Sequence, residues 1–129
     1  MVALILVVDD DEPVRVMLAR LLTTAGYQVH ACANAAEARA WLESNEPDLL
    51  VTDIVMPGDS GIELRRFVSQ RYPHVPAILI SGYSAEEPAE FAARQPDTVF
   101  IPKPFTADEL LELVERMLPE EKLPRRTRS

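Results

Sequence analysis

Residues 4–11, Leu4-Ile5-Leu6-Val7-Val8-Asp9-Asp10-Asp11, form a short apolar run that ends abruptly in three carboxylates, and this pattern is the first evidence for the fold. Four further apolar runs follow along the chain, at residues 27–32, 49–51, 77–80 and 99–101. All but the run at 27–32 are continuous, which is typical of strands buried on both faces of a parallel sheet. The run at 27–32 alternates apolar and polar residues, which predicts a half-exposed strand at a sheet edge.

Helical patterns separate these runs. Apolar residues at helical spacing between Val14 and Ala25, Met17 among them, predict a helix that Gly26 ends. Each of four later helices begins with a capping residue and has a glutamate three positions on. The capping residues are Asn34, Ser60, Ser84 and Thr106. Because Pro88 falls inside the fourth of the five helices, we expect that helix to be short, displaced or frayed. Leu111 lies off the apolar stripe of the last helix, which predicts an exposed side chain.

Strand and helix therefore alternate five times, which predicts an α/β fold of (βα)5 type with right-handed crossovers and helices on both faces. With the second strand at an edge, the doubly wound parallel sheet has the order 2-1-3-4-5. We expect one domain over residues 1–118. Pro119 ends it, and residues 119–129 are expected to form a solvated tail or the stub of a linker.

Composition excludes several classes of protein. The 129 residues carry 13 Lys and Arg against 21 Asp and Glu, a net charge of −8, which argues against direct nucleic-acid binding. A single cysteine, Cys32, allows no internal disulfide and fits a reducing compartment. The longest apolar run, residues 2–8, is too short for a bilayer and lacks the features of a signal peptide. The expectation is a soluble, cytoplasmic protein without membrane contact.

In such sheets the functional crevice lies at the carboxyl ends of the strands. Asp9 and Asp10 follow the first strand, Asp53 ends the third, Ser81 ends the fourth, and Lys103 follows the fifth. Converging carboxylates repel one another unless a cation is present. The two histidines and one cysteine make no zinc set, so an oxygen-liganded ion is expected, Mg²⁺ first and Mn²⁺ as the alternative.

A carboxylate, a metal, a lysine and a hydroxyl together indicate a phosphoryl-acceptor site. Asp53 is the expected nucleophile, because an ionised carboxylate attacks phosphorus without a general base. Asp10 would hold the metal directly, Asp9 would hold it through water or as a second-shell group, and the Val55 carbonyl would complete the shell. Lys103 would pair with one phosphoryl oxygen, and the Ser81 hydroxyl would donate to another.

Each of these residues also has a plain structural explanation. Asp11, beside Asp9 and Asp10, is expected to cap the first helix, and an aspartate before a proline turn is common turn chemistry. Lys103 alone is typical of a solvated lysine, and Ser81 alone of a loop hydroxyl. The site is favoured because all the required groups fall at the ends of one sheet.

Four stretches together resemble the receiver (response-regulator) domain of two-component signalling: residues 5–11, 52–58, 80–82 and 102–105, in the family's order and spacing. The resemblance covers residues 4–118 and implies a flavodoxin-like fold. It also implies that Asp53 accepts phosphate from a phosphohistidine on a histidine kinase or phosphotransfer domain, with Mg²⁺ on Asp10, Asp53 and the Val55 carbonyl.

The resemblance further identifies Ser81 as the switch hydroxyl and Phe100 as the switch aromatic. Phosphorylation would then reshape the face made by the fourth helix, fifth strand and fifth helix. The Lys103–Pro104 bond would be cis. Phe100 lacks the hydroxyl of the tyrosine often found there, so the packing switch survives without a hydrogen-bonded readout.

Two features affect the biology that the resemblance implies. Several motifs look more like receivers of hybrid sensor kinases than like those of transcription factors, so both a stand-alone receiver and a segment of a longer kinase fit the sequence. An apolar Val55 and a bulky Tyr83 would flank the attacking water, which predicts slow self-dephosphorylation without true enzyme turnover.

Two alternative functions stay open. A phosphohydrolase of the haloacid-dehalogenase type would need a second aspartate two positions after the nucleophile, where Val55 stands. A pseudo-receiver would act as a constitutive binding module. Eleven tail residues hold no output domain, so output is expected through an unknown downstream protein. The chain is expected to be a monomer or a weak phosphorylation-dependent dimer.

Overall fold

The computed structural model describes residues 2–82 and 97–124 of the chain. Its strands are β1 (Leu4–Val8), β2 (Gln28–Cys32), β3 (Leu49–Asp53), β4 (Ala77–Ser81) and β5 (Thr98–Pro102). Its helices are α1 (Glu12–Thr24), α2 (Ala35–Leu42), α3 (Gly61–Arg71), α5 (Ala107–Met117) and the short 3₁₀ helix η1 (Glu120–Lys122). All strands pair in parallel in the order β2-β1-β3-β4-β5, which confirms the predicted topology.

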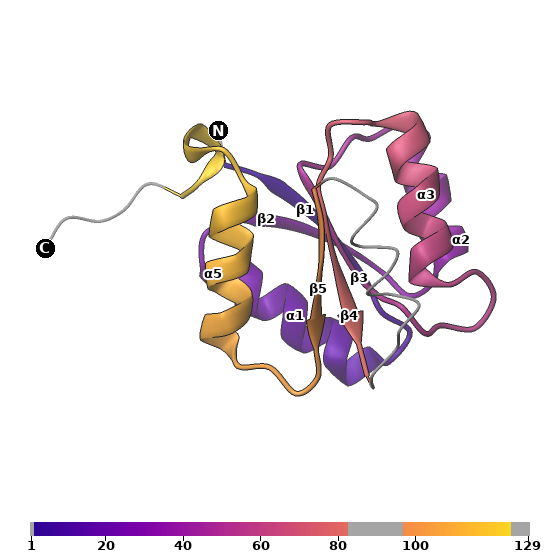
Figure 1. Ribbon diagram of the computed structural model, residues 1–129, viewed down its shortest axis with the longest axis horizontal. Coiled ribbons are helices and arrows are strands. Elements are labelled where there is room, and N and C mark those ends of the chain that lie inside the picture. Colours follow the sequence, from indigo (N-terminus) through magenta and orange to yellow (C-terminus); the bar gives the residue numbers. More distant parts are fainter. Residues whose placement is uncertain (1, 83–96, 125–129) are drawn as a thin grey trace, which may run out of the picture.

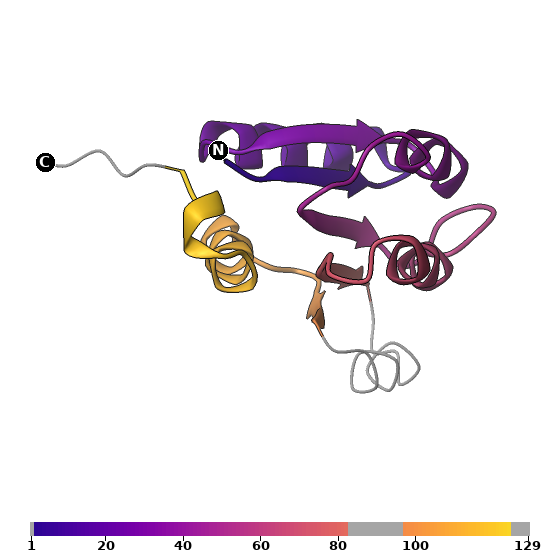
Figure 2. The ribbon, with the colours of Figure 1, turned by 90° about the horizontal axis from the view of Figure 1, so that it is seen from above.

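Helices cover both faces of this sheet: α1 and α5 lie on one side, and α2 and α3 on the other (Figures 1 and 2). In β1, Ile5 and Val7 belong to the core beneath α1 and α5, whereas Leu6 and Val8 belong to the core beneath α2 and α3. Neighbouring residues of one strand therefore enter opposite cores. This is the physical reason for the continuous apolar run, since both sides of the strand exclude water.

The two edge strands differ in how well the sequence predicted them. β2 lies at an edge, as its alternation indicated, and the ring of His30 stacks on Trp41 of α2 with centroids 4.6 Å apart. β5 forms the other edge, and Val99 is 37% exposed. The predicted order placed this strand at the edge, but its continuous apolar run was interpreted as burial on both faces, and the exposed Val99 contradicts that second expectation.

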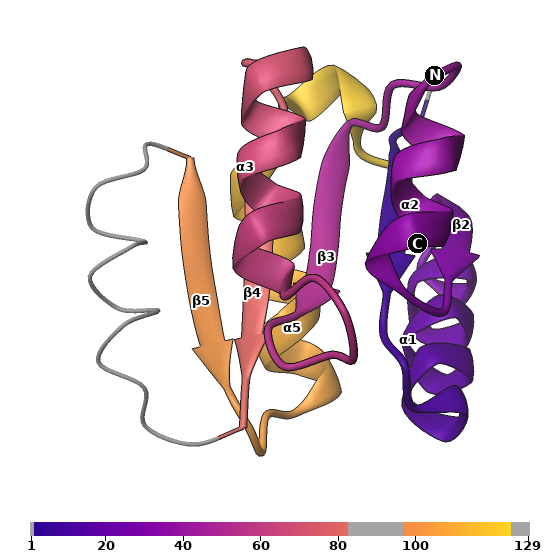
Figure 3. The same cartoon turned by 90° about the vertical axis from the view of Figure 1, so that its right-hand side faces the viewer.

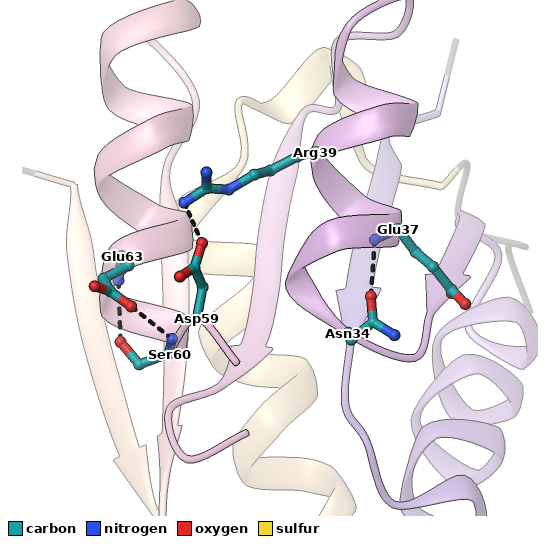
Figure 4. Close-up of polar contacts among 6 residues, drawn as sticks. All are labelled: Asn34, Glu37, Arg39, Asp59, Ser60 and Glu63. Carbon is teal, nitrogen blue, oxygen red and sulfur yellow. Dashed lines mark hydrogen bonds and ion pairs between the residues drawn. The ribbon is translucent and has the colours of Figure 1, made fainter. Parts of the chain in front are cut away.

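Three of the predicted helix caps are present. The side chains of Asn34, Ser60 and Thr106 each accept a hydrogen bond from the backbone N–H three residues on. At Ser60 and Thr106 the glutamate also bonds back to the capping residue, which completes a capping box. The caps at Asn34 and Ser60 are visible in Figure 4. The predicted helix at Ser84 lies outside the described residues, as does Pro88.

Two helical side chains depart from the predicted pattern. Met17 of α1, assigned to the apolar face, is 50% exposed. Leu111 of α5, expected to be exposed, is half-buried against the core that α1 and α5 share. Both errors have one cause: residues at the margin of an apolar stripe are buried or exposed according to the width of the neighbouring surface, which spacing alone does not give.

The segment expected to be a solvated tail instead returns to the domain as far as residue 124. The Ala3 N–H donates to the Lys122 carbonyl at 2.9 Å, and Lys122 Nζ lies 3.3 Å from an Asp48 oxygen. Leu123 packs against the core beneath α1 and α5. The boundary expected at residue 118 was thus too early, because an apolar side chain after Pro119 still had core surface to cover. In the described part of the chain, no helix is long and apolar enough to cross a membrane.

Candidate functional site

The carboxyl ends of the strands meet at the lower edge of the sheet in Figure 3, where the arrowheads of β3, β4 and β5 point. Asp9 follows β1 directly, and Asp53 is the last residue of the neighbouring strand β3. One carboxylate oxygen from each of Asp9, Asp10 and Asp53 lies within 4.8 Å of the other two. The structure therefore brings together the three carboxylates that the strand ends predicted.

Asp9 and Asp53 are buried, whereas Asp10 is exposed. Asp9 Oδ1 accepts a hydrogen bond from the Asp11 N–H at 2.9 Å, but the buried Oδ2 has no hydrogen-bond partner. Asp11 occupies the N-cap position of α1 without a cap bond from its own side chain, so the expected capping role was wrong. An unpartnered buried carboxylate oxygen is costly and is a natural ligand for a cation.

Burial shifts the pKa of both buried carboxylates upward, which makes ionisation of Asp9 and Asp53 less favourable than in water. Burial raises the pKa of Asp9, which the Asp11 N–H partly offsets and the charge of Asp53 reinforces. Burial also raises the pKa of Asp53, while the Lys103 charge and a backbone hydrogen bond at Ile54 oppose it. A divalent cation at this point would reverse the balance, since it stabilises both ionised carboxylates at once.

The chemistry of this cluster fits Mg²⁺. All its donors are carboxylate oxygens, and Mg²⁺ is commonly held by one or two carboxylates together with waters and phosphate oxygens. Asp10 is exposed and Asp53 is 8% exposed, whereas Asp9 is fully buried. Val55, whose carbonyl was predicted to join the shell, lies two residues after Asp53 with its side chain 76% exposed.

The loop after Asp53, residues 54–60, has a closed base. The Gly61 N–H donates to the Ile54 carbonyl at 2.8 Å, and the Ile54 N–H donates to the Ile80 carbonyl of β4 at 3.0 Å. A Cβ atom at position 61 would overlap the carbonyl oxygen of Asp53. Only glycine therefore allows α3 to start this close to the end of β3.

The remaining predicted residues lie on the neighbouring strands. Ser81 is buried at the end of β4, and its carbonyl accepts a hydrogen bond from the Lys103 N–H at 2.7 Å. Lys103 is exposed, and its bond to Pro104 is cis, as predicted. Phe100 is half-buried and packs against a small apolar cluster under the loop: Ile54, Ile62 and Leu79. Tyr83, expected beside the site, lies outside the described residues.

Two supporting residues were missed by sequence reasoning. The Arg15 guanidinium of α1 donates to the Asp9 carbonyl at 2.9 Å, and the buried Thr52 hydroxyl donates to the Asp53 carbonyl at 3.0 Å. Both contacts brace the backbone at a strand end. No motif marks either residue, because a single arginine or threonine becomes recognisable only when its partner is known.

Comparison with known proteins agrees with this geometry. The chain is 40% identical over 112 residues to the DNA-binding transcriptional regulator NtrC of Escherichia coli strain K12, which covers 87% of this chain and 24% of that protein. It is 35% identical over 120 residues to NtrC of Rhizobium meliloti strain 1021, covering 93% of this chain and 25% of that protein. The chain thus spans about a quarter of the length of these relatives.

Solved structures show the same fold. The chemotaxis protein CheY4 of Vibrio cholerae superposes with a TM-score of 0.84 at 28% identity, covering 92% of this chain and all of that one. NtrX from Brucella abortus, solved with ADP, gives 0.83 at 35% identity and covers 92% of this chain and 27% of that one. Because the response regulator receiver domain family matches residues 5–115, the chain belongs to that family of two-component signalling domains.

Proposed function

We propose that Asp53 accepts a phosphoryl group from a phosphohistidine, on a histidine kinase or a histidine phosphotransfer domain, in a reaction that requires Mg²⁺. The observation that carries this proposal is the cluster of three carboxylates at the ends of β1 and β3, one of them with a buried, unpartnered oxygen. Asp10 and Asp53 would hold the ion directly with the Val55 carbonyl, and Asp9 would hold it through water or as a second-shell group.

The transfer needs no general base on this chain. A carboxylate oxygen of Asp53 forms a bond to phosphorus while the bond from phosphorus to the donor's ring nitrogen breaks, and that nitrogen keeps the electron pair. When bound, Mg²⁺ would neutralise negative charge on the transferring group. Ionised Asp53 is the reactive form, and the Lys103 charge favours it against the effect of burial.

Lys103 and Ser81 are assigned to the oxygens of the bound phosphoryl group. Lys103 would form an ion pair with one oxygen, and the Ser81 hydroxyl would donate to another. The Lys103 N–H donates a hydrogen bond to the Ser81 carbonyl, so a displacement of one backbone segment would be transmitted to the other. This link supports a concerted response of β4 and β5 to phosphorylation.

The proposed output is a change of packing at Phe100. Movement of Ser81 toward the phosphoryl group would open space that the ring enters, and the face over the fourth helix, β5 and α5 would change shape. The described part of that face includes the exposed Val99 on β5 and a surface groove with Leu113 and Arg116 of α5. A downstream protein is the proposed reader of this face.

A protein donor is favoured over a small molecule by the surface of α1. Val16 and Met17 are 44% and 50% exposed, and α1 begins two residues after Asp10. Large apolar side chains beside a charged site are typical of protein contacts. We infer that the donor domain rests on this helix during transfer.

The phosphoryl group is proposed to be long-lived. The exposed Val55 side chain lies beside the site and offers no hydrogen bond to orient an attacking water. Hydrolysis of a radioactively labelled phosphoryl group on Asp53 should therefore be slow. Replacing Val55 by Asn and Tyr83 by Glu should accelerate it. Loss of most of the label from the wild type within seconds would contradict this.

The first test is intact mass after incubation with acetyl phosphate, with and without Mg²⁺, on the wild type and Asp53→Asn. One Mg²⁺-dependent phosphoryl addition that disappears in Asp53→Asn is the expected result. A folded wild type that gains no mass would favour the pseudo-receiver alternative. Sustained release of phosphate from a phosphomonoester would instead favour the phosphohydrolase alternative.

A further inference from the structure

Arg39 of α2 reaches across to the loop that follows Asp53 (Figure 4). Its Nη2 atom lies 2.6 Å from Oδ2 of Asp59, which stands near the end of that loop. Its guanidinium carbon also lies 5.2 Å from the centre of the Phe67 ring of α3. One side chain of α2 therefore contacts both the loop and α3, which directly follows the loop in sequence.

This contact differs from an ordinary surface ion pair. The two side chains are 40% and 43% exposed, but the Nε atom of Arg39 is buried without a hydrogen-bond partner. The inner part of the guanidinium is thus enclosed by protein while its outer edge pairs with Asp59. A planar cation can stack on a ring and pair with a carboxylate at the same time, which a lysine cannot do as well.

The loop that Arg39 contacts adjoins the carboxylate cluster. It starts at Ile54 and Val55, and hydrogen bonds at both of these backbone positions lower the pKa of Asp53. The base of the loop is fixed by the Gly61 N–H bond to the Ile54 carbonyl, and Met56 is buried in the core under α2 and α3. The ion pair to Arg39 adds a second anchor at Asp59, two residues before Gly61.

We propose that Arg39 is a positioning residue for the metal site. By holding Asp59, it keeps residues 54–60 in the conformation that presents the Val55 carbonyl to the cation and the Ile54 and Val55 backbone to Asp53. This inference rests on the proposed function, because it assumes that the three carboxylates bind Mg²⁺. It assigns to α2, a helix without a residue in the site, a direct effect on the affinity of that site.

The test is the dissociation constant for Mg²⁺, measured by NMR titration of the backbone amides in residues 53–61. A partly exposed ion pair is worth a fraction of a kcal/mol to about 1 kcal/mol, so Arg39→Gln and Asp59→Asn should each weaken binding about two- to fivefold. The double variant should bind no more weakly than either single variant. Arg39→Lys should recover part of the loss, and the effect should shrink at high salt.

Arg20→Gln is the matched control, since it removes the same charge from an exposed position on α1. A merely structural role for Arg39 would shift the urea midpoint of Arg39→Gln without changing its Mg²⁺ affinity. Hydrogen exchange of residues 55–59 in metal-free protein gives a second measurement, and it should be faster in Arg39→Gln than in Arg20→Gln.

The outcomes separate the two proposals. If the wild type binds Mg²⁺ and Arg39→Gln binds it equally well, this inference is overturned while the proposed function stands. If the wild type itself does not bind Mg²⁺, the metal-dependent function is overturned and this inference with it. Additive losses in the double variant would also overturn it, because Arg39 and Asp59 would then act separately.

Discussion

Replacing Asp9 by Asn should stabilise the protein when no divalent metal is present. Asp9 is fully buried, and its Oδ2 atom has no hydrogen-bond partner. Leaving a buried polar group unsatisfied costs about 1–3 kcal/mol, and more for a charged one, so Asp9→Asn should raise the free energy of unfolding at pH 7 by about that amount. The new Nδ2 donor would lie near the carboxylates of Asp10 and Asp53.

The sign of the pH dependence follows from the direction of the pKa shift. Burial raises the pKa of Asp9 in the folded protein above its ordinary value of 3.8. Between that value and the raised one, the folded state binds more protons than the unfolded state, so the contribution of Asp9 to stability falls as the pH rises. The advantage of Asp9→Asn should therefore be small near pH 4 and grow as the pH rises from 3.8 through the raised pKa of Asp9.

The assay is urea unfolding in EDTA, followed by circular dichroism at several pH values, with the slope against urea as a check on two-state behaviour. Asp11→Asn is the control, because it removes the same charge from an exposed side chain that forms no cap bond. It should change stability by less than about 0.5 kcal/mol. A destabilised Asp9→Asn at pH 7, or a gain in stability that does not depend on pH, would contradict an energetic cost of the buried Asp9 carboxylate. Excess Mg²⁺ should stabilise the wild type more than Asp9→Asn.

Three further predictions concern the scaffold around the site. Gly61→Ala should lower the free energy of unfolding, measured in urea, by about 2 kcal/mol or more, because the new Cβ would overlap the Asp53 carbonyl. Gly82→Ala is the control, and it should not lower this free energy because the space around Gly82 is open. Leu123→Ala should lower the free energy of unfolding by about 1–2 kcal/mol in the same assay, since this half-buried side chain packs on the core. An unchanged free energy of unfolding would indicate that residues 119–124 form a free tail. The Cys32 thiol should react slowly with a disulfide reagent at pH 8, because burial raises its pKa from 9.0 to about 11 and so lowers its thiolate fraction about a hundredfold; reaction as fast as a small free thiol would contradict this.

The strand order could be predicted from the sequence because two independent patterns agreed. Continuous apolar runs indicated parallel strands with helices on both faces, and the alternation at residues 27–32 placed β2 at an edge. Given that order, the strand ends alone brought Asp9 and Asp53 together, since β1 and β3 are neighbours. The position of the carboxylate cluster therefore followed from topology before any side-chain geometry was known.

The contacts that brace this site could not be predicted in the same way. Arg39 lies 20 residues before Asp59 in the sequence, and nothing in either neighbourhood marks them as partners. Their contact depends on the distance between α2 and the loop, which is set by packing of side chains in the core beneath α2 and α3. Leu123 was missed for a related reason: a proline marks where a helix ends, but it does not exclude further packing after it.

The location of the carboxylates explains where a response to phosphorylation should appear. β1 and β3 lie in the interior of the sheet, and the residues of β3 are all buried, so the strands that carry Asp9 and Asp53 have little freedom to move. β5 lies at the edge, with Val99 exposed and Phe100 only half-buried. A change in charge at Asp53 is therefore expected to cause movement at the edge strand β5 and not in β1 or β3. The Ser81–Lys103 backbone hydrogen bond, which joins β4 to the residues after β5, would transmit this movement.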